Sequence, residues 1–156
     1  MSECPNEREI TLEKLHQAVI KQGDNLEELL WNALLAYQGY VFYTSSGLPF
    51  SYIVKRKKNG EYSGELLVSR KESSKTLTKS SVFLAFRRVA GATRICNING
   101  RTEMISPEYK GPKAIGQIFG ISYIYSIFWE FGLIRVPDRI EKRLAGIVEK
   151  RPDDDI

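Results

Sequence analysis

The spacing of apolar residues changes once along the chain, near Gly39, and this change restricts the chain to a mixed architecture. Before Gly39, apolar residues recur three and four positions apart, as on one face of a helix. From Tyr40 onward, apolar and polar side chains alternate, as in strands with one buried face. We therefore predict an α+β fold with an N-terminal helical pair, a three-stranded antiparallel meander and C-terminal helices, an order compatible with a winged-helix-like arrangement.

Two helices are expected before the change. Thr11 is the predicted N-cap of the first helix and Gly23 its end. Asp24 is the predicted cap of the second helix, because Glu27 stands three residues later as in a capping box, and Gly39 ends that helix.

The meander is predicted over residues 40–44, 50–55 and 65–70. Asn59 and Gly60 separate the last two strands, and Asn-Gly favours a hairpin because both residues tolerate positive φ. A second Asn-Gly pair, Asn99 and Gly100, predicts a short hairpin between residues 94–98 and 101–105.

Hydroxyl-bearing and basic residues dominate the segment 69–81, which we predict to be a loop that ends in a helix capped by Thr78 or Ser80. Such a helix start could hold an anionic oxygen, and an ordinary loop and cap explains it equally. Pro112 suits the first position of a further helix, and residues 138–150 form an amphipathic pattern with Ile140, Leu144, Ile147 and Val148 on one face. Residues 1–151 are predicted to form one domain, and residues 152–156 an acidic tail.

Composition points to an ordinary globular protein of the cytoplasm. The chain has 156 residues, of which 42% are hydrophobic, enough to bury a core without disulfides. The two cysteines, Cys4 and Cys96, are far apart in the sequence and form no disulfide framework, and the N-terminus lacks the pattern of a secretory signal. The longest apolar stretch, 114–134, is interrupted by glycines and Glu130, so we expect no membrane span.

Positive charge is concentrated in the middle of the chain. Between Lys55 and Arg88 there are ten basic residues and three acidic ones, in a chain of net charge +4. Such a concentration is typical of proteins that bind polyanions, because Lys and Arg release counterions condensed on phosphates. A solvated surface is the alternative explanation.

Residues 113–133 have the outline of a helix-turn-helix. Gly116, a turn glycine at Gly120, the apolar Ile121 and the polar Ser122 resemble the turn and the start of the second helix in that family. The resemblance implies that the helix from Tyr123 reads DNA. That helix is mostly apolar, so a scaffold of the winged-helix type without DNA contact, or a plain core helix, remain alternatives. The order of these segments also resembles small uncharacterised proteins of Gram-positive mobile elements or phages, which implies a role in DNA transactions or against a host defence system.

We expect no enzymatic activity, no cofactor and no metal. His16 is predicted on the surface without a partner, and one histidine with two distant cysteines cannot build a zinc site. The glutamates of the basic segment, Glu61, Glu65 and Glu72, could imitate a nuclease centre but more simply balance charge. Glu130 is expected to face water or, if buried, to pair with Arg87 or Arg88.

Two functions from different classes follow from these features. The first is a small nucleic-acid-binding accessory or regulatory protein, with DNA as the expected partner. Its predicted contacts are Lys55, Arg56, Lys57, Lys58, Arg70, Lys71, Lys75, Lys79, Lys113, Ser122 and Tyr123. The second is a protein-binding inhibitor, similar to anti-CRISPR proteins, of a nucleic-acid-handling enzyme. Its expected anchors are Tyr40, Tyr43, Tyr52, Tyr62 and Tyr109.

Overall fold

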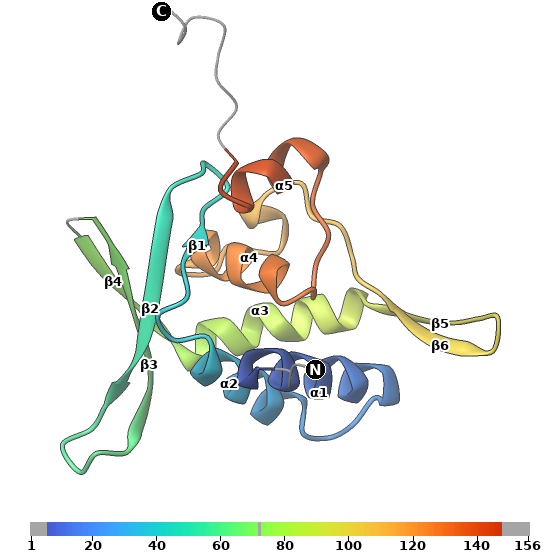
Figure 1. The fold of residues 1–156 in the computed structure, drawn as a ribbon, viewed down its shortest axis with the longest axis horizontal. Helices are drawn as coiled ribbons and strands as arrows, with labels where there is room; N and C mark the ends of the chain where they lie inside the picture. The colour runs from blue at the N-terminus through green and yellow to red at the C-terminus, as the bar shows by residue number, and fades with distance from the viewer. Residues whose placement is uncertain (1–5, 72, 148–156) are drawn as a thin grey trace, which may run out of the picture.

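The computed structural model describes residues 6–71 and 73–147, which form an α+β structure as predicted (Figure 1). In chain order the elements are α1 (Glu7–Lys21), α2 (Leu26–Ala36), β1 (Phe42–Tyr43), β2 (Pro49–Arg56), β3 (Tyr62–Arg70), β4 (Ser73–Thr78), α3 (Lys79–Ala92), β5 (Arg94–Ile98), β6 (Arg101–Ile105), the 3₁₀ turn η1 (Pro112–Ala114), α4 (Ile121–Glu130) and α5 (Asp138–Leu144). A four-stranded sheet stands at one side of the molecule, and the helices lie on the other side of that sheet (Figure 1).

The main sheet is antiparallel with strand order β1-β2-β3-β4. Alternation along β2 and β3 turns one face toward the helices, where Tyr52, Leu66 and Val68 are almost fully buried. The prediction of three strands was wrong by one, because β4 occupies part of the segment predicted as a loop. Its one buried apolar residue, Leu77, pairs with Leu66, and the remaining residues are hydroxyls and one lysine.

Helix α4 forms the centre of the core, since seven of its ten residues are buried. Tyr123 packs edge-on against Phe50 of β2, and Phe128 against Phe86 of α3. The predicted cap at Ser122 is replaced by Gly120, which has φ 76° and lies so close to β4 that a Cβ there would collide with the side chain of Leu77. The capping prediction at Thr78 is confirmed for α3, where the Thr78 hydroxyl accepts a hydrogen bond from the Ser81 amide.

The first two helices exist as predicted, but their caps differ. Helix α1 starts four residues earlier than expected, because the Asn6 side chain accepts a hydrogen bond from the Glu9 amide and replaces Thr11 as the cap. Asn25, without a side-chain cap bond, takes the place predicted for Asp24.

The carboxyl end of α2 is satisfied by side chains from three other places. The last carbonyls of a helix have no partner within it. The hydroxyl of Tyr52 donates to Leu34 O at 2.6 Å, Gln38 Nε2 donates to Leu35 O, and Arg8 Nε donates to Ala36 O. These bonds tie the sheet and α1 to the end of α2.

The predicted hairpin at residues 94–105 is confirmed with the predicted bounds. Asn99 and Gly100 both have positive φ, 53° and 79°, as a two-residue type I′ turn requires. The hairpin projects away from the rest of the molecule, with β6 against α1 (Figure 1).

The last described segment contains η1 and α5. Pro112 begins only a three-residue 3₁₀ turn rather than a longer helix. Helix α5 buries Ile140 and Leu144 as predicted, whereas Ile147 is 58% exposed, contrary to the prediction. Val148 and the acidic tail 152–156 lie outside the described residues. None of the described helices combines the length and apolarity that crossing a bilayer demands.

Candidate nucleic-acid interface

The second face of the main sheet, which we call the outer face, has no helix over it. It is formed by the residues that alternate with the buried ones on β2, β3 and β4: Ser51, Ile53, Lys55, Glu65, Leu67, Ser69, Ser74, Thr76 and Thr78. Ile53 at its centre is 51% exposed. The registers place these residues in rows across the strands, so that three serines stand side by side: Ser51 faces Ser69, and Ser69 faces Ser74.

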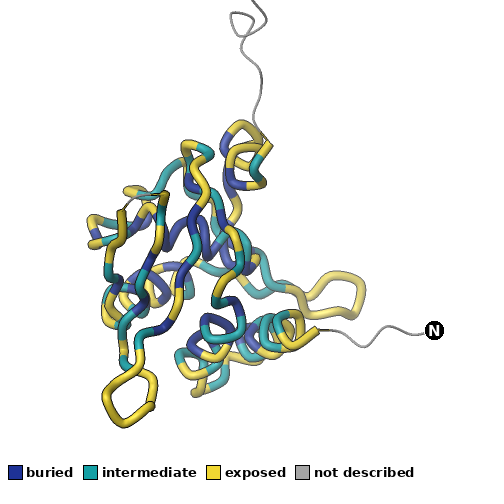
Figure 2. Tube along the Cα trace, turned by 60° about the vertical axis from the view of Figure 1, so that its left-hand side comes forward, coloured by how far each residue is buried: buried dark blue, intermediate teal, exposed yellow. Residues whose placement is uncertain are grey.

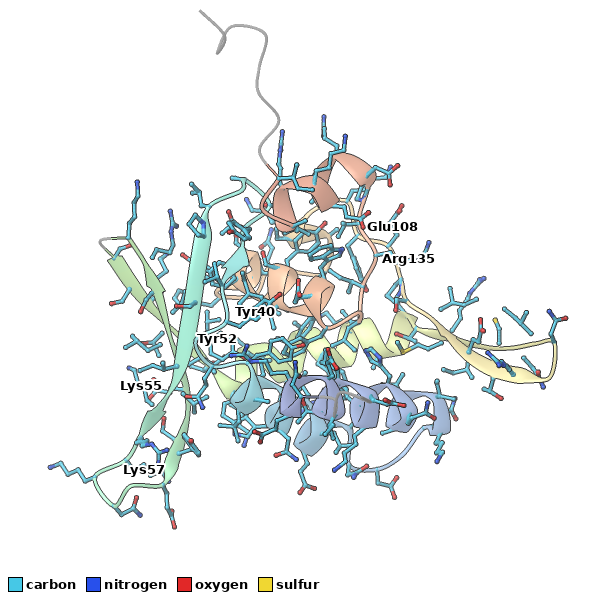
Figure 3. The ribbon with its side chains drawn as sticks, in the orientation of Figure 1. Tyr40, Tyr52, Lys55, Lys57, Glu108 and Arg135 are labelled. Atoms are coloured by element: carbon cyan, nitrogen blue, oxygen red, sulfur yellow. The ribbon has the colours of Figure 1, made fainter. Side chains whose placement is uncertain are left out.

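Basic side chains gather at both ends of this face. Lys57 and Lys58 lie in the β2–β3 turn, which is closed by a hydrogen bond from the Lys57 amide to Glu61 O. Arg70 and Lys71 lie at the opposite end of β3, in the turn to β4. The tip of the β2–β3 hairpin is exposed (Figure 2), and Figure 3 shows Lys55 and Lys57 on the side of the sheet away from the helices.

Little of this positive charge is neutralised within the chain. In residues 6–71 and 73–147 the structure contains a single ion pair, between Arg87 and Glu27 at 2.7 Å, and both partners lie outside the outer face. Lys55 donates to the hydroxyl of Thr76 at 3.0 Å rather than to a carboxylate. The charges of Lys57, Lys58 and Lys71 are exposed to solvent.

Three of the predicted phosphate contacts are also engaged in contacts within the protein. The guanidinium of Arg56 stacks over the ring of Tyr62 and donates to its hydroxyl at 2.8 Å. Arg70 donates to the hydroxyl of Tyr123 at 3.2 Å, and the ammonium of Lys79 lies 4.6 Å from the ring centre of Trp31. These basic groups therefore have structural partners as well as charge.

The other predicted contacts are dispersed. Lys75 pairs with Val68, so it lies on the inner side of the edge strand, although it is exposed. Lys113 is exposed on η1, away from the sheet turns in the sequence, and Ser122 is exposed in the first turn of α4. Tyr123 is only 3% exposed. Because α4 is the core helix, its apolar side chains cannot enter a DNA groove without leaving the core.

The hydroxyl row was missed by reasoning from sequence. Ser51, Ser69 and Ser74 come from three strands, and their proximity depends on a register that includes the unpredicted strand β4. The signal that was available is the alternation of small polar with apolar residues through 73–78.

Two polar residues predicted to face solvent have partners from distant segments. His16 is half-buried and its Nε2 donates to Phe131 O at 2.6 Å. Glu130 is half-buried and accepts a hydrogen bond from the Tyr40 hydroxyl at 2.6 Å, so neither Arg87 nor Arg88 is its partner. This hydrogen bond, together with burial, raises the pKa of Tyr40 to about 12.

The expected protein-binding tyrosines are mostly not available as anchors. Tyr52 is 1% exposed, and its burial raises its pKa well above the usual value. Tyr40, Tyr43 and Tyr109 are half-buried, and Tyr62, at 39% exposed, is covered on one side by Arg56.

The carboxylates do not assemble a catalytic centre. Glu61 lies at the exposed tip of the hairpin, Glu65 is on the outer face, and Glu72 lies outside the described residues. In the described part of the chain, no three His, Cys, Asp or Glu side chains come together in a way that could hold a metal ion.

Comparison with known proteins adds no family. A scan against models of protein families, a search of curated proteins and a search of solved structures each found no match.

Proposed function

We propose that this protein binds duplex nucleic acid, with DNA as the expected form, through the sugar-phosphate backbone along the outer face of its sheet. The observation that carries the proposal is the outer face itself: it is open, and lysines at both of its ends have no carboxylate partner among the described residues. Unpaired lysines on an uncovered surface can release counterions from phosphates at little cost within the protein.

The dimensions of the sheet suit a duplex. Strand β3 has nine residues. At a rise of about 3.3 Å per residue, it separates the two basic turns by roughly 30 Å. One turn of B-form DNA is about 34 Å long, so Lys57 and Lys58 at one end and Lys71 at the other could contact phosphates about one helical turn apart.

The chemistry between the two ends also favours a duplex over a single strand. None of the nine outer-face residues is aromatic, whereas proteins that bind single strands usually offer rings on which bases stack. The serine row of Ser51, Ser69 and Ser74 supplies hydroxyl donors of the kind that contact phosphate oxygens. Binding of this type positions a protein on nucleic acid without reading its sequence.

The test is a salt titration of affinity for labelled duplex and single-stranded DNA, with three charge-matched variants. K57Q/K58Q removes two charges from one basic end, and K55Q/K71Q removes one from the outer face and one from the other end. K14Q/K21Q removes two exposed lysines from α1, outside the sheet.

Each sheet variant should lower the slope of log affinity against log salt by roughly 2, about one for each phosphate that the variant no longer touches, and the α1 variant should leave the slope unchanged. An equal reduction of the slope in all three variants would show that only net charge matters. No binding at low salt, or a preference for single strands, would contradict the proposal.

A further inference from the structure

A groove lies at the other side of the molecule, between α1 and the projecting hairpin, and it belongs to no function discussed so far. Its volume is about 560 Å³, and its lining comes from one face of α1 and from three consecutive residues of β6: Glu9, Leu12, Glu13, His16, Gln17, Ile20, Thr102, Glu103 and Met104. Leu12, Ile20 and Met104 are half-buried and form an apolar floor.

The groove is negatively charged although the protein is positively charged. Three carboxylates line it, from Glu9, Glu13 and Glu103, and no Lys or Arg does. The single ion pair among the described residues lies elsewhere, between Arg87 and Glu27, so these three carboxylates have no cationic partner in the described chain. The charge therefore favours a cationic occupant.

The β6 wall of the groove is an unpaired strand edge. In a two-residue hairpin the residues flanking the turn, Ile98 and Arg101, form a hydrogen-bonded pair, and the pairs alternate from there. Thr102 and Met104 thus belong to non-hydrogen-bonded pairs, and their N–H and C=O groups point away from β5. Among the described residues β6 pairs with β5 alone.

The lining residues place this free edge inside the groove. Thr102 and Met104 have side chains on one face of the hairpin and Glu103 on the other, because side chains alternate along a strand. A groove that touches all three consecutive residues therefore borders the edge of β6 rather than one of its faces. An edge beside an apolar floor is the geometry in which an extended peptide adds a strand to a sheet.

We propose that this groove binds an extended peptide segment of a partner protein, with basic side chains alternating with aliphatic ones, as a third strand on β6. The backbone of the peptide would bond to Thr102 and Met104, its aliphatic side chains would pack on Leu12 and Ile20, and its basic side chains would face Glu9, Glu13 and Glu103. A two-stranded hairpin is marginally stable alone, so a third strand would also stabilise the hairpin.

The probe is a short acetylated peptide of alternating lysine and valine, titrated into ¹⁵N-labelled full-length protein and followed by amide chemical shifts. Two control peptides accompany it: one with glutamate in place of lysine, and one N-methylated on alternate backbone amides so that it cannot pair with a strand edge. The expected result is saturable shifts at Leu12, Ile20 and residues 101–105 with the first peptide, and affinity at least roughly tenfold weaker for both controls.

The matched protein variants are T102P and T102V. Proline removes the outward amide of Thr102 without removing a bond to β5, and valine keeps that amide, so only T102P should lose the peptide. DNA affinity should be the same in both, which separates this site from the outer face. The E9Q/E13Q/E103Q variant should weaken binding of the lysine peptide and remove its preference over the glutamate peptide.

Four results would overturn the proposal: no binding of the lysine peptide, equal binding of the glutamate or N-methylated peptide, shifts located outside the groove, or equal affinity of T102P and T102V. A concentration-dependent dimer of the free protein that T102P abolishes would also overturn it, because a second copy of the chain would then occupy the edge.

Discussion

The molecule contains two hairpins with the same Asn-Gly dipeptide, and their differences show how far a local signal extends. In the β5–β6 hairpin both Asn99 and Gly100 have positive φ, which gives a tight two-residue turn. In the β2–β3 hairpin only Gly60 does, and a hydrogen bond from its amide to Lys57 O belongs to a wider loop. The dipeptide favours a hairpin in both places, but it does not decide the turn type.

The surroundings of the two hairpins differ more than their turns. The β2–β3 hairpin is the middle of a four-stranded sheet, with one face on the core and an outer face with basic ends. The β5–β6 hairpin stands apart as a two-stranded sheet and meets α1 across an acidic groove. We therefore expect the first to contribute to global stability and the second to open locally.

The largest test of this contrast is truncation of one apolar side chain in each hairpin. Leu66, in β3, is fully buried, so L66A should cost about 2 to 5 kcal/mol of unfolding free energy. Met104, in β6, is half-buried, and M104A should cost about 1 kcal/mol. Urea denaturation measures both. Equal costs would mean that the projecting hairpin is part of the main cooperative unit.

Removal of one hydroxyl should also separate the buried part of the sheet from its exposed tip. Tyr52 donates to Leu34 O in the core, and Y52F leaves that helix-end carbonyl without its partner, at a cost of about 1 to 3 kcal/mol. Tyr62 accepts a bond from Arg56 on the exposed tip, and Y62F should cost no more than about 0.5 kcal/mol. Thermal unfolding of the two variants is the measurement. A small effect of Y52F would show that the Tyr52 hydroxyl does not fix α2 to the sheet.

The two asparagines give a test of turn type. N99A should destabilise the β5–β6 hairpin by about 1 to 2 kcal/mol, because alanine disfavours the positive φ found there, whereas N99G should be tolerated. N59A should have a smaller effect, because Asn59 does not have positive φ. Hydrogen exchange of the Cys96 and Glu103 amides, which belong to a hydrogen-bonded pair, reports on the first hairpin. Unchanged exchange in N99A would contradict the turn assignment.

The smallest expected effect concerns alkaline pH. Its hydrogen bond to Glu130 raises the pKa of Tyr40 from 10.0 to about 12, so the folded protein favours the neutral phenol. This contribution is complete below pH 10 and is lost as the pH rises toward 12. The free energy of unfolding of wild-type protein should therefore fall more steeply over this interval than that of Y40F, as urea titrations at a series of pH values would show.

The projecting hairpin has no tyrosine between residues 94 and 105, so the exchange of its amides should show no corresponding difference between wild type and Y40F. Identical pH slopes for global unfolding of the two proteins would show that the Tyr40–Glu130 bond does not contribute.

Prediction from sequence succeeded where structure depends on neighbours in the chain. The bounds of residues 94–98 and 101–105 and the cap at Thr78 follow from turn and cap chemistry within a few positions. Strand β4 was missed because five of its six residues are polar and only Leu77 is buried, so its hydroxyls suggested a loop.

The site was only partly predictable, for a related reason. Charge concentration along the chain identified the lysines at both ends of the outer face, but the register that aligns Ser51, Ser69 and Ser74 cannot be inferred from one segment. The partners of His16 and Glu130 are 115 and 90 residues away in sequence, beyond any local pattern.

Gly120 has a consequence for how this sequence can evolve. Its backbone has φ 76°, and any side chain would strike Leu77 at the place where α4 meets the edge strand. Lysines on the sheet can be exchanged for arginines or shifted by a residue while the surface stays positive, so they should drift quickly. Substitution at position 120 would require β4 to move as well. In distant descendants of this gene we therefore expect the glycine, with a small or flexible apolar residue opposite it, to persist after the basic surface has changed.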